Sequence, residues 1–170
     1  MVKLIAMIAA FIVCTFIGNT SASRLKYRAD GIDELLCVAR DIAAQMRFQR
    51  KTLPELVRQV SIQRECVLWK VLAEQLLYSG FSDAWTTAVK IARETDKKIM
   101  FLKIPELSVM QNLAHELGRS DLATQQRQLK FTENALEEIY SAACEEQQRC
   151  TKLYRTLGIS AGITCAIVIW

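Results

Sequence analysis

A long heptad pattern near the carboxyl terminus constrains the fold of this chain more than any other feature. Between residues 122 and 157 an apolar or small side chain recurs at every seventh position, and neither Gly nor Pro interrupts the segment before Gly158. The recurring residues are Leu122, Leu129, Leu136, Ala143, Cys150 and Leu157. Because this spacing keeps the side chains on one face of a helix, the segment predicts a single long α-helix with a continuous packing face.

The same helix is expected to continue into an uncharged carboxyl terminus. Residues 157–170, LGISAGITCAIVIW, carry no charged side chain, so we expect the helix to pass from water into hydrocarbon. From Tyr154 to Trp170 the helix is about 24 Å long, which is short for a bilayer core of about 30 Å. Residues 157–170 are therefore predicted to be a marginal transmembrane segment. A helix lying on the membrane surface is the alternative, which the lack of a polar face disfavours.

Residues 4–17 form a second apolar run, which Lys3 precedes. One interpretation is a signal peptide cleaved near residues 21–23, which would give a secreted helical protein with an unknown binding role. The other is an uncleaved transmembrane anchor over residues 1–23. Positive charge favours the anchor, because basic residues flank the cytoplasmic ends of membrane segments. These residues are Arg24, Lys26 and Arg28 after the first run and Arg149, Lys152 and Arg155 before the second. Residues 24–156 are therefore predicted to be cytoplasmic, with both basic groups facing anionic lipid.

Composition predicts an all-α domain between the two membrane segments. A chain of 170 residues has room for one domain, and its two Pro and six Gly beside many Leu, Ala, Glu, Lys and Arg favour helix over sheet. We expect a cytosolic bundle of about six helices, flanked by the amino- and carboxyl-terminal transmembrane helices. The last helix of the bundle is expected to be continuous with the carboxyl-terminal span.

Residues that usually begin or end helices divide this domain. The expected helix starts are Asp30, a capping box over residues 52–55 that includes Pro54, residue 62, Ser82, Pro105, and Ser120 or Asp121. Gly80 is expected to end the helix over residues 62–78 in a left-handed conformation, Gly118 to end the helix that starts near Pro105, and residues 95–103 to form a charged connector.

Apolar side chains at helical spacing predict the inner face of each helix. The predicted core residues are Ile32, Leu35, Leu36, Ala39, Ile42, Ala43, Met46, Leu56, Val57, Val60, Cys66, Trp69, Leu72, Ala73, Leu76, Leu77, Trp85, Ala88, Val89, Ala92, Leu107, Met110, Leu113, Ala114 and Leu117.

The sequence contains no recognisable catalytic or metal-binding pattern. Cys37, Cys66, Cys144 and Cys150 lack CxxC spacing, which favours free thiols in a reducing compartment over disulfides or a metal site. His115 is the single histidine, and the phosphate-loop, GxSxG and HExxH motifs are missing. A net charge of +4 is too dispersed to indicate nucleic-acid binding. We therefore expect no enzymatic activity, no metal and no cofactor.

The long helix carries an acidic segment. Between residues 131 and 148 the charged side chains are Glu133, Glu137, Glu138, Glu145 and Glu146. This segment predicts a docking surface for a basic partner, or for the basic residues Arg47, Arg50 and Lys51 of the same chain. A solvated helix face is the alternative, since exposed charges usually contribute little.

Small residues recur at four-residue spacing in both apolar ends. They are Gly158, Gly162 and Ala166 in one segment and Ala6, Ala10, Cys14 and Gly18 in the other. Such strips allow close approach of helix backbones in lipid, so we expect them to pack the two membrane helices together or to pack each against a partner's helix.

The carboxyl-terminal third carries a specific resemblance. Residues 117–121, LGRSD, are followed by Gln125, then by residues 143–146, ACEE, and residues 152–162, KLYRTLGISAG. This sequence resembles the stage III sporulation protein AB family, whose pattern ends in an LG.SD block, a charged helix and a KxYxxLG membrane terminus. Weaker agreement over residues 52–54 and 84–85 extends the resemblance over nearly the whole chain.

The resemblance implies a non-enzymatic platform of the channel that links mother cell and forespore during endospore formation. It implies a location in the mother-cell membrane facing the forespore, with a cytoplasmic domain similar to those of platform proteins in type II secretion and type IV pilus machines. The implied partners are the secretion-type ATPase of the apparatus and its other membrane and ring-forming proteins. Gly118, Asp121 and Gln125, together with Glu137 and Glu138, are the candidate partner-binding residues.

Overall fold

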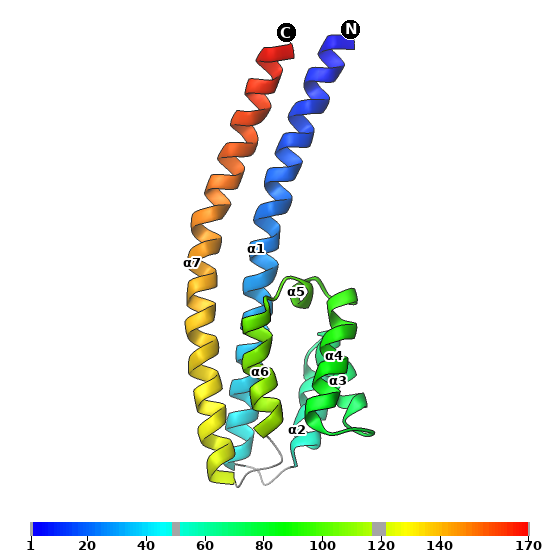
Figure 1. Cartoon of the computed structure of the whole chain (residues 1–170), viewed down its shortest axis with the longest axis vertical. Coiled ribbons are helices and arrows are strands. Elements are labelled where there is room, and N and C mark those ends of the chain that lie inside the picture. Colours follow the sequence, from blue (N-terminus) through cyan, green and yellow to red (C-terminus); the bar gives the residue numbers. More distant parts are fainter. Residues whose placement is uncertain (1, 49–51, 117–121, 170) are drawn as a thin grey trace. The chain divides into compact units, whose positions relative to one another are not determined.

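Two long helices, α1 (Val2–Phe48) and α7 (Leu122–Ile169), carry the two ends of the chain (Figure 1). The computed structural model describes residues 2–48, 52–116 and 122–169. The described residues form seven helices and no strand, so the predicted all-α class is confirmed. The last helix also continues into the uncharged terminus as predicted, because α7 reaches Ile169 without a break.

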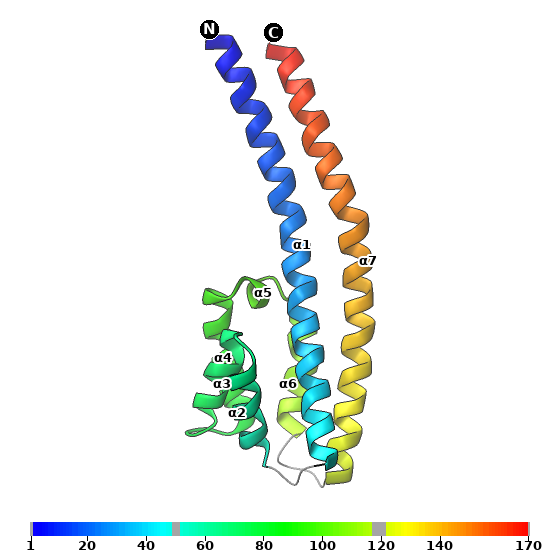
Figure 2. The same cartoon turned by 180° about the vertical axis from the view of Figure 1, so that it is seen from behind.

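The chain divides into two compact units. Unit 1 contains Met1–Tyr27 and Ala142–Trp170, and unit 2 contains Arg28–Ser141. In unit 1 the first part of α1 and the last part of α7 lie side by side, with the two termini at the same end (Figures 1 and 2). The two uncharged ends thus belong to one unit. By length and hydropathy, none of the described helices qualifies to cross a membrane.

The predicted helix start at Asp30 is wrong, because Asp30 lies inside α1. Residues 18–29 contain no Pro, and polar side chains here bond within the helix: Ser23 Oγ donates to the Asn19 carbonyl at 2.9 Å. A helix continues where nothing breaks its hydrogen-bond ladder, so the apolar run and the first predicted bundle helix form one element.

Unit 2 is completed by the short helices α2 (Leu53–Gln63), α3 (Val67–Gln75), α4 (Phe81–Thr95), α5 (Lys97–Met100) and α6 (Ile104–Glu116). Helix α3 packs against α2 and α4, and α4 also contacts α5 and α6. Trp69 of α3 and Trp85 of α4 are buried with their ring centroids 6.1 Å apart and tilted by 42°, a favourable aromatic arrangement.

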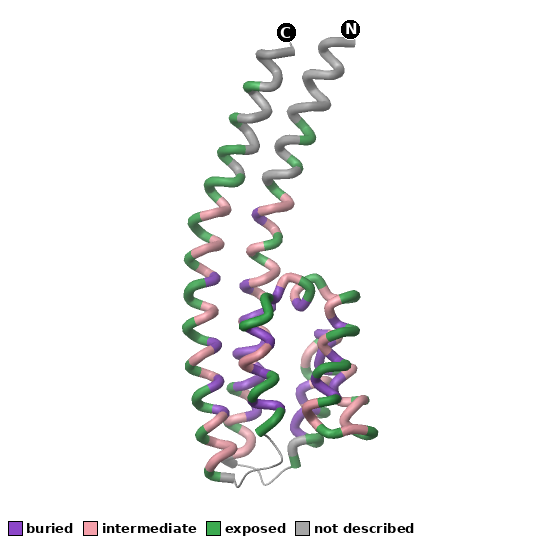
Figure 3. Tube along the Cα trace, in the orientation of Figure 1, coloured by how far each residue is buried: buried purple, intermediate pink, exposed green. Residues whose placement is uncertain are grey.

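Buried side chains follow the stripes that helical periodicity predicted (Figure 3). The predicted core residues that are buried are Ile32, Leu35, Leu36, Ala39, Ile42, Leu56, Val57, Val60, Cys66, Trp69, Leu72, Trp85, Ala88, Ala92, Leu107, Met110, Leu113 and Ala114. Ala43, Met46, Ala73, Leu76 and Val89 are half-buried, and Leu117 lies outside the described residues. Leu77 is exposed, so its predicted core position is wrong: it lies in the turn after α3, where helical spacing no longer applies.

Local capping signals placed several helix starts correctly. The Thr52 backbone N–H donates to the Glu55 carboxylate at 2.9 Å, and Pro54 occupies the first turn of α2. The charged connector contains the single turn of α5, which the Asp96 side chain caps by accepting from the Lys98 N–H at 2.9 Å. Pro105 lies in the first turn of α6 as predicted. Gly118, Ser120 and Asp121 lie outside the described residues.

Two predicted boundaries are wrong. The expected helix over residues 62–78 is interrupted, because α2 ends at Gln63, Arg64 adopts an extended conformation, and α3 begins at Val67. Gly80 has φ −64° rather than a left-handed conformation, and it is the residue that precedes α4. Ser82 therefore lies in the first turn of α4 and does not cap it.

Gly31 allows α1 and the α5 segment to approach closely. A Cβ atom at this position would lie 2.5 Å from the Lys98 carbonyl oxygen and 3.2 Å from the Leu102 Cδ2. The first contact is with backbone, which cannot rotate away as a side chain would. Gly31 is thus required by tertiary packing, although Gly is unfavourable inside a helix.

We expect Gly31→Ala to lower the free energy of unfolding by about 2 kcal/mol, because overpacking against backbone outweighs the gain in helix propensity of about 1 kcal/mol. Gly80→Ala is the matched control, since a Cβ there meets nothing within 4 Å. Urea unfolding followed by circular dichroism measures both variants. Equal stability of the two would show that α5 does not press on α1.

Candidate functional site

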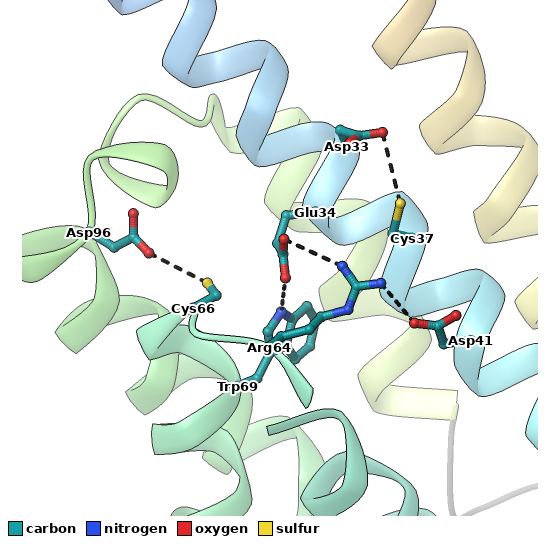
Figure 4. A network of polar contacts seen from close by, with 8 residues as sticks. All are labelled: Asp33, Glu34, Cys37, Asp41, Arg64, Cys66, Trp69 and Asp96. Carbon is teal, nitrogen blue, oxygen red and sulfur yellow. Dashed lines mark hydrogen bonds and ion pairs between the residues drawn. The ribbon is translucent and has the colours of Figure 1, made fainter. Parts of the chain in front are cut away.

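A network of polar contacts attaches Arg64, which lies between α2 and α3, to helix α1 (Figure 4). Arg64 lies 2.8 Å from the Asp41 carboxylate and 3.5 Å from the Glu34 carboxylate, both on α1. Glu34 also accepts a hydrogen bond from the Trp69 indole N–H at 3.1 Å. The network thus orients the buried Trp69 as well as the Arg64 backbone, which gives it a structural role.

The thiol of Cys66 lies beside this network and is buried. The Cys66 thiol donates to Asp96 at 3.5 Å (Figure 4), and burial raises the pKa of Cys66 from 9.0 to about 12. The thiolate is the reactive form of cysteine, so Cys66 is a poor nucleophile and a poor metal ligand near neutral pH. Cys37, Cys144 and Cys150 are also free thiols.

The remaining candidates for metal or acid–base chemistry are dispersed. Within the described ranges, no group of three or more His, Cys, Asp or Glu side chains is arranged to hold a metal ion. His115 lies on the exposed end of α6, with its Nδ1 atom 3.7 Å from the carboxylate of the adjacent Glu116.

The acidic segment of α7 has a partner within unit 2. Arg40 of α1 donates to Glu133 at 3.0 Å and lies 3.1 Å from Glu137. The sequence did not identify Arg40 as the cation that meets this segment. Glu138 and Glu145 are exposed, and Glu146 is half-buried. Of the basic residues predicted to meet the segment, Arg50 and Lys51 and the side chain of Arg47 lie outside the described part of the chain.

Arg28 makes a buried ion pair, a position that differs from its predicted lipid-facing role. Its Nη2 atom lies 2.6 Å from Glu106 Oε1, and its Nε–H donates to the same oxygen at 2.8 Å. The side chains of Arg28 and Glu106 are only 12% and 2% exposed. The second oxygen of Glu106 accepts the Lys103 N–H at 2.6 Å, so this carboxylate joins α1 to the first turn of α6.

The other predicted site residues are dispersed over the two units. Arg24, Lys26, Arg149 and Lys152 are exposed, and Gln125 is half-buried on α7. Gly118 and Asp121 lie outside the described residues, as do the side chains of Arg155, Ala166 and Cys14. Gly158, Gly162 and Ala10 lie within α7 and α1, and the packing of the small-residue strips stays a prediction.

An apolar groove that the sequence did not indicate lies between α4 and α6. Its volume is about 160 Å³, which suits one protruding side chain of a partner better than a small-molecule ligand, whose sites usually exceed about 300 Å³. Buried Trp85 and Leu107 contribute to it, and the exposed Ile104 stands beside them. The other lining residues are Thr86, Val89, Ser108 and Gln111.

We expect Arg28→Met to lower the free energy of unfolding by about 3 kcal/mol, because the Glu106 charge is left buried without its cation. The double variant Arg28→Met, Glu106→Gln should recover part of this loss. Arg40→Met is the control, since an exposed pair contributes about 0.5 kcal/mol. Chemical unfolding of the four proteins measures these differences. Similar losses for Arg28→Met and Arg40→Met would contradict a buried charge pair.

Comparisons with known proteins agree along nearly the whole chain. Residues 3–170 match the family described as Stage III sporulation protein AB (spore_III_AB). The chain is similar to the Stage III sporulation protein AB of Bacillus subtilis (strain 168), with 24% identity over 182 residues that cover 99% of each protein. No solved structure matches the chain.

Proposed function

The chain belongs to the stage III sporulation protein AB family, and on this basis we propose that it is a non-enzymatic, membrane-tethered platform of the channel between mother cell and forespore. Family membership indicates a role in sporulation. The membrane tether, the platform role and the partners go beyond family membership and are proposed below from the surfaces of the two units.

Exposed apolar side chains in unit 1 are the observation that supports a tether. Among the side chains of unit 1 that the structure describes, six large apolar ones are between 40 and 68% exposed: Ile12, Val13, Phe16, Leu153, Tyr154 and Leu157. In water such side chains lose the free energy that burial would provide, about 25 cal/mol for each Å² of apolar surface. All six lie in or beside the two uncharged ends, which belong to one unit. Insertion of both ends into the mother-cell membrane would cover them.

Unit 2 would then be the part that meets cytoplasmic partners. The exposed carboxylates of Glu137 and Glu138 on α7 offer a surface for a basic region, and the α4–α6 groove offers a binding site for one apolar side chain. We propose that the secretion-type ATPase of the apparatus docks on the acidic surface. Electrostatic complementarity of this kind chiefly sets association rate and specificity.

We expect the wild-type chain to sediment with membranes and to resist carbonate extraction. The double variant Phe16→Glu, Leu157→Glu should move largely to the supernatant, because it places a charge in each uncharged end. Leu77→Glu, which changes an apolar residue of unit 2 that is 75% exposed, should behave as wild type. Recovery of the wild-type chain in the supernatant would contradict the tether. An intact mass that corresponds to a chain starting near Arg24 would also contradict it and would favour a secreted protein.

We expect Glu138→Lys to weaken binding to the ATPase about tenfold at low salt and less at high salt. Glu138 is the informative position because Glu137 is already paired with Arg40, so a Glu137 variant would also disturb unit 2. Glu94→Lys is a control with the same charge change on the exposed side of α4. Titration of the full-length chain in detergent with purified ATPase measures the affinity, and equal dissociation constants for the two variants would exclude the acidic surface.

A further inference from the structure

An exposed aromatic side chain lies on the outer face of α7. Phe131 is 67% exposed and belongs to the part of α7 that lies in unit 2. Arg127, four residues before it, and Glu138, seven residues after it, are exposed on the same helix face. Within the described ranges, neither of these two charges takes part in an ion pair or a side-chain hydrogen bond. The outer face of α7 thus carries, in chain order, a cation, an aromatic ring and an anion.

The α4–α6 groove has the size of one aromatic ring. Its volume is about 160 Å³, and an apolar cavity of about 150 Å³ holds a benzene molecule. Buried Trp85 and Leu107 and the exposed Ile104 provide its apolar walls. A phenyl ring that entered the groove would leave water and would also cover Ile104, and both changes favour binding.

The exposed rim of the groove carries the complementary charges. Trp85, Thr86 and Val89 line the groove from α4. Asp83, three residues before Thr86, and Lys90, four residues after it, share the exposed face of α4 with Thr86. In the part of the chain that the structure describes, Asp83 and Lys90 form no ion pair. The order on α4 is therefore anion, groove, cation, which is the complement of the order on α7.

We propose that Phe131 enters the α4–α6 groove of a second copy of this chain. Phe131 does not occupy the groove of its own chain, because its side chain is exposed. With the ring in place, Arg127 faces Asp83 of the second copy. Glu138 faces Lys90 of that copy, and the two long side chains span the additional helical turn between them. Each copy carries both halves of the contact, so two copies can form a two-fold pair or several copies can form a row.

Tyr78 is the other candidate for the groove, since it is the second exposed aromatic side chain among the described residues of unit 2. It is 82% exposed in the turn between α3 and α4. Glu74 and Asp83 lie before and after it in the chain, and both are exposed. Tyr78 would therefore bring negative charge to a rim that already carries Asp83, and like charges oppose association. Phe131, with Arg127 beside it, is the better match.

The contact is expected to be weak and reversible. One aromatic ring and two exposed ion pairs cover less than the roughly 1,000 Å² that a stable interface buries. The contact assigns an occupant to the groove described above, and it depends on neither the membrane tether nor the ATPase. Because Glu138 also belongs to the surface proposed for the ATPase, one α7 can take part in only one of the two contacts at a time.

The test uses the full-length chain in detergent, with a diazirine-bearing phenylalanine in place of Phe131 or, as the control, in place of Tyr78. Irradiation should give a crosslinked dimer from position 131, and mass spectrometry should locate the crosslink in α4 or α6 of the second copy. Thr86→Phe, which fills the groove from its exposed rim, should lower the yield about tenfold, because the ring loses its binding site. Position 78 should give little dimer.

A charge swap tests the orientation of the two helices. Arg127→Asp or Asp83→Arg alone should lower the crosslink yield about fivefold at low salt, because each variant brings like charges together. The double variant should recover the yield, since the ion pair is restored with its signs exchanged. Glu74→Arg, which makes the same kind of charge change on the exposed side of α3, should leave the yield unchanged.

A chain that gives no dimer from position 131, or a crosslink located outside α4 and α6, would overturn the proposal. A yield that neither Thr86→Phe nor the single charge changes reduce would also overturn it. Groove crosslinks from position 78 in place of position 131 would assign the groove to Tyr78. If circular dichroism shows that Thr86→Phe does not fold, the charge swap decides, because it changes exposed residues alone. The samples contain no bilayer and no ATPase, so failure here would leave the tether and the ATPase contact standing.

Discussion

The packing of the short helices on one another, together with their polar attachment to α1, is the constraint on which unit 2 depends. Helices α2 to α6 have 4 to 15 residues, and isolated helices of this length are marginal in water. Their stability must come from burial, and the stripe from Ile32 to Ile42 provides an apolar surface inside unit 2. Arg64 and Glu106 add two polar attachments to α1, at different points along the helix. The short helices are therefore ordered by burial in the core of unit 2 more than by their own propensity.

Arg28 and Arg40 both form ion pairs in unit 2, but they differ in burial. Arg28 is removed from water on Glu106, where loss of one partner would leave a charge without compensation. Arg40 meets Glu133 and Glu137 near the surface, where solvent screens the pair and its contribution is small. The sequence alone does not distinguish Arg28, which is buried in the ion pair, from Arg40, which lies near the surface. Only the first is suited to hold α6 in place.

The two units of this sporulation protein differ in the kind of surface that they present. Unit 1 combines the uncharged ends with exposed apolar side chains, properties that fit contact with hydrocarbon. Unit 2 combines a buried core with charged and apolar features on its surface, properties on which the proposed contact with proteins rests.

The sequence by itself determined the features that depend on neighbours in one helix. Periodicity identified the buried positions Leu129, Leu136 and Met110, and the α2 capping box marked a true helix start. The fusion of the apolar run with the first bundle helix was missed, because capping propensity at Asp30 is overridden when no residue breaks the ladder. Tertiary structure alone decided that Arg28 meets Glu106, 78 residues away, and that Arg40 meets Glu133, 93 residues away. The reason is physical: periodicity encodes which face of a helix is apolar, whereas the partner of a charge depends on which helices the folded core brings together.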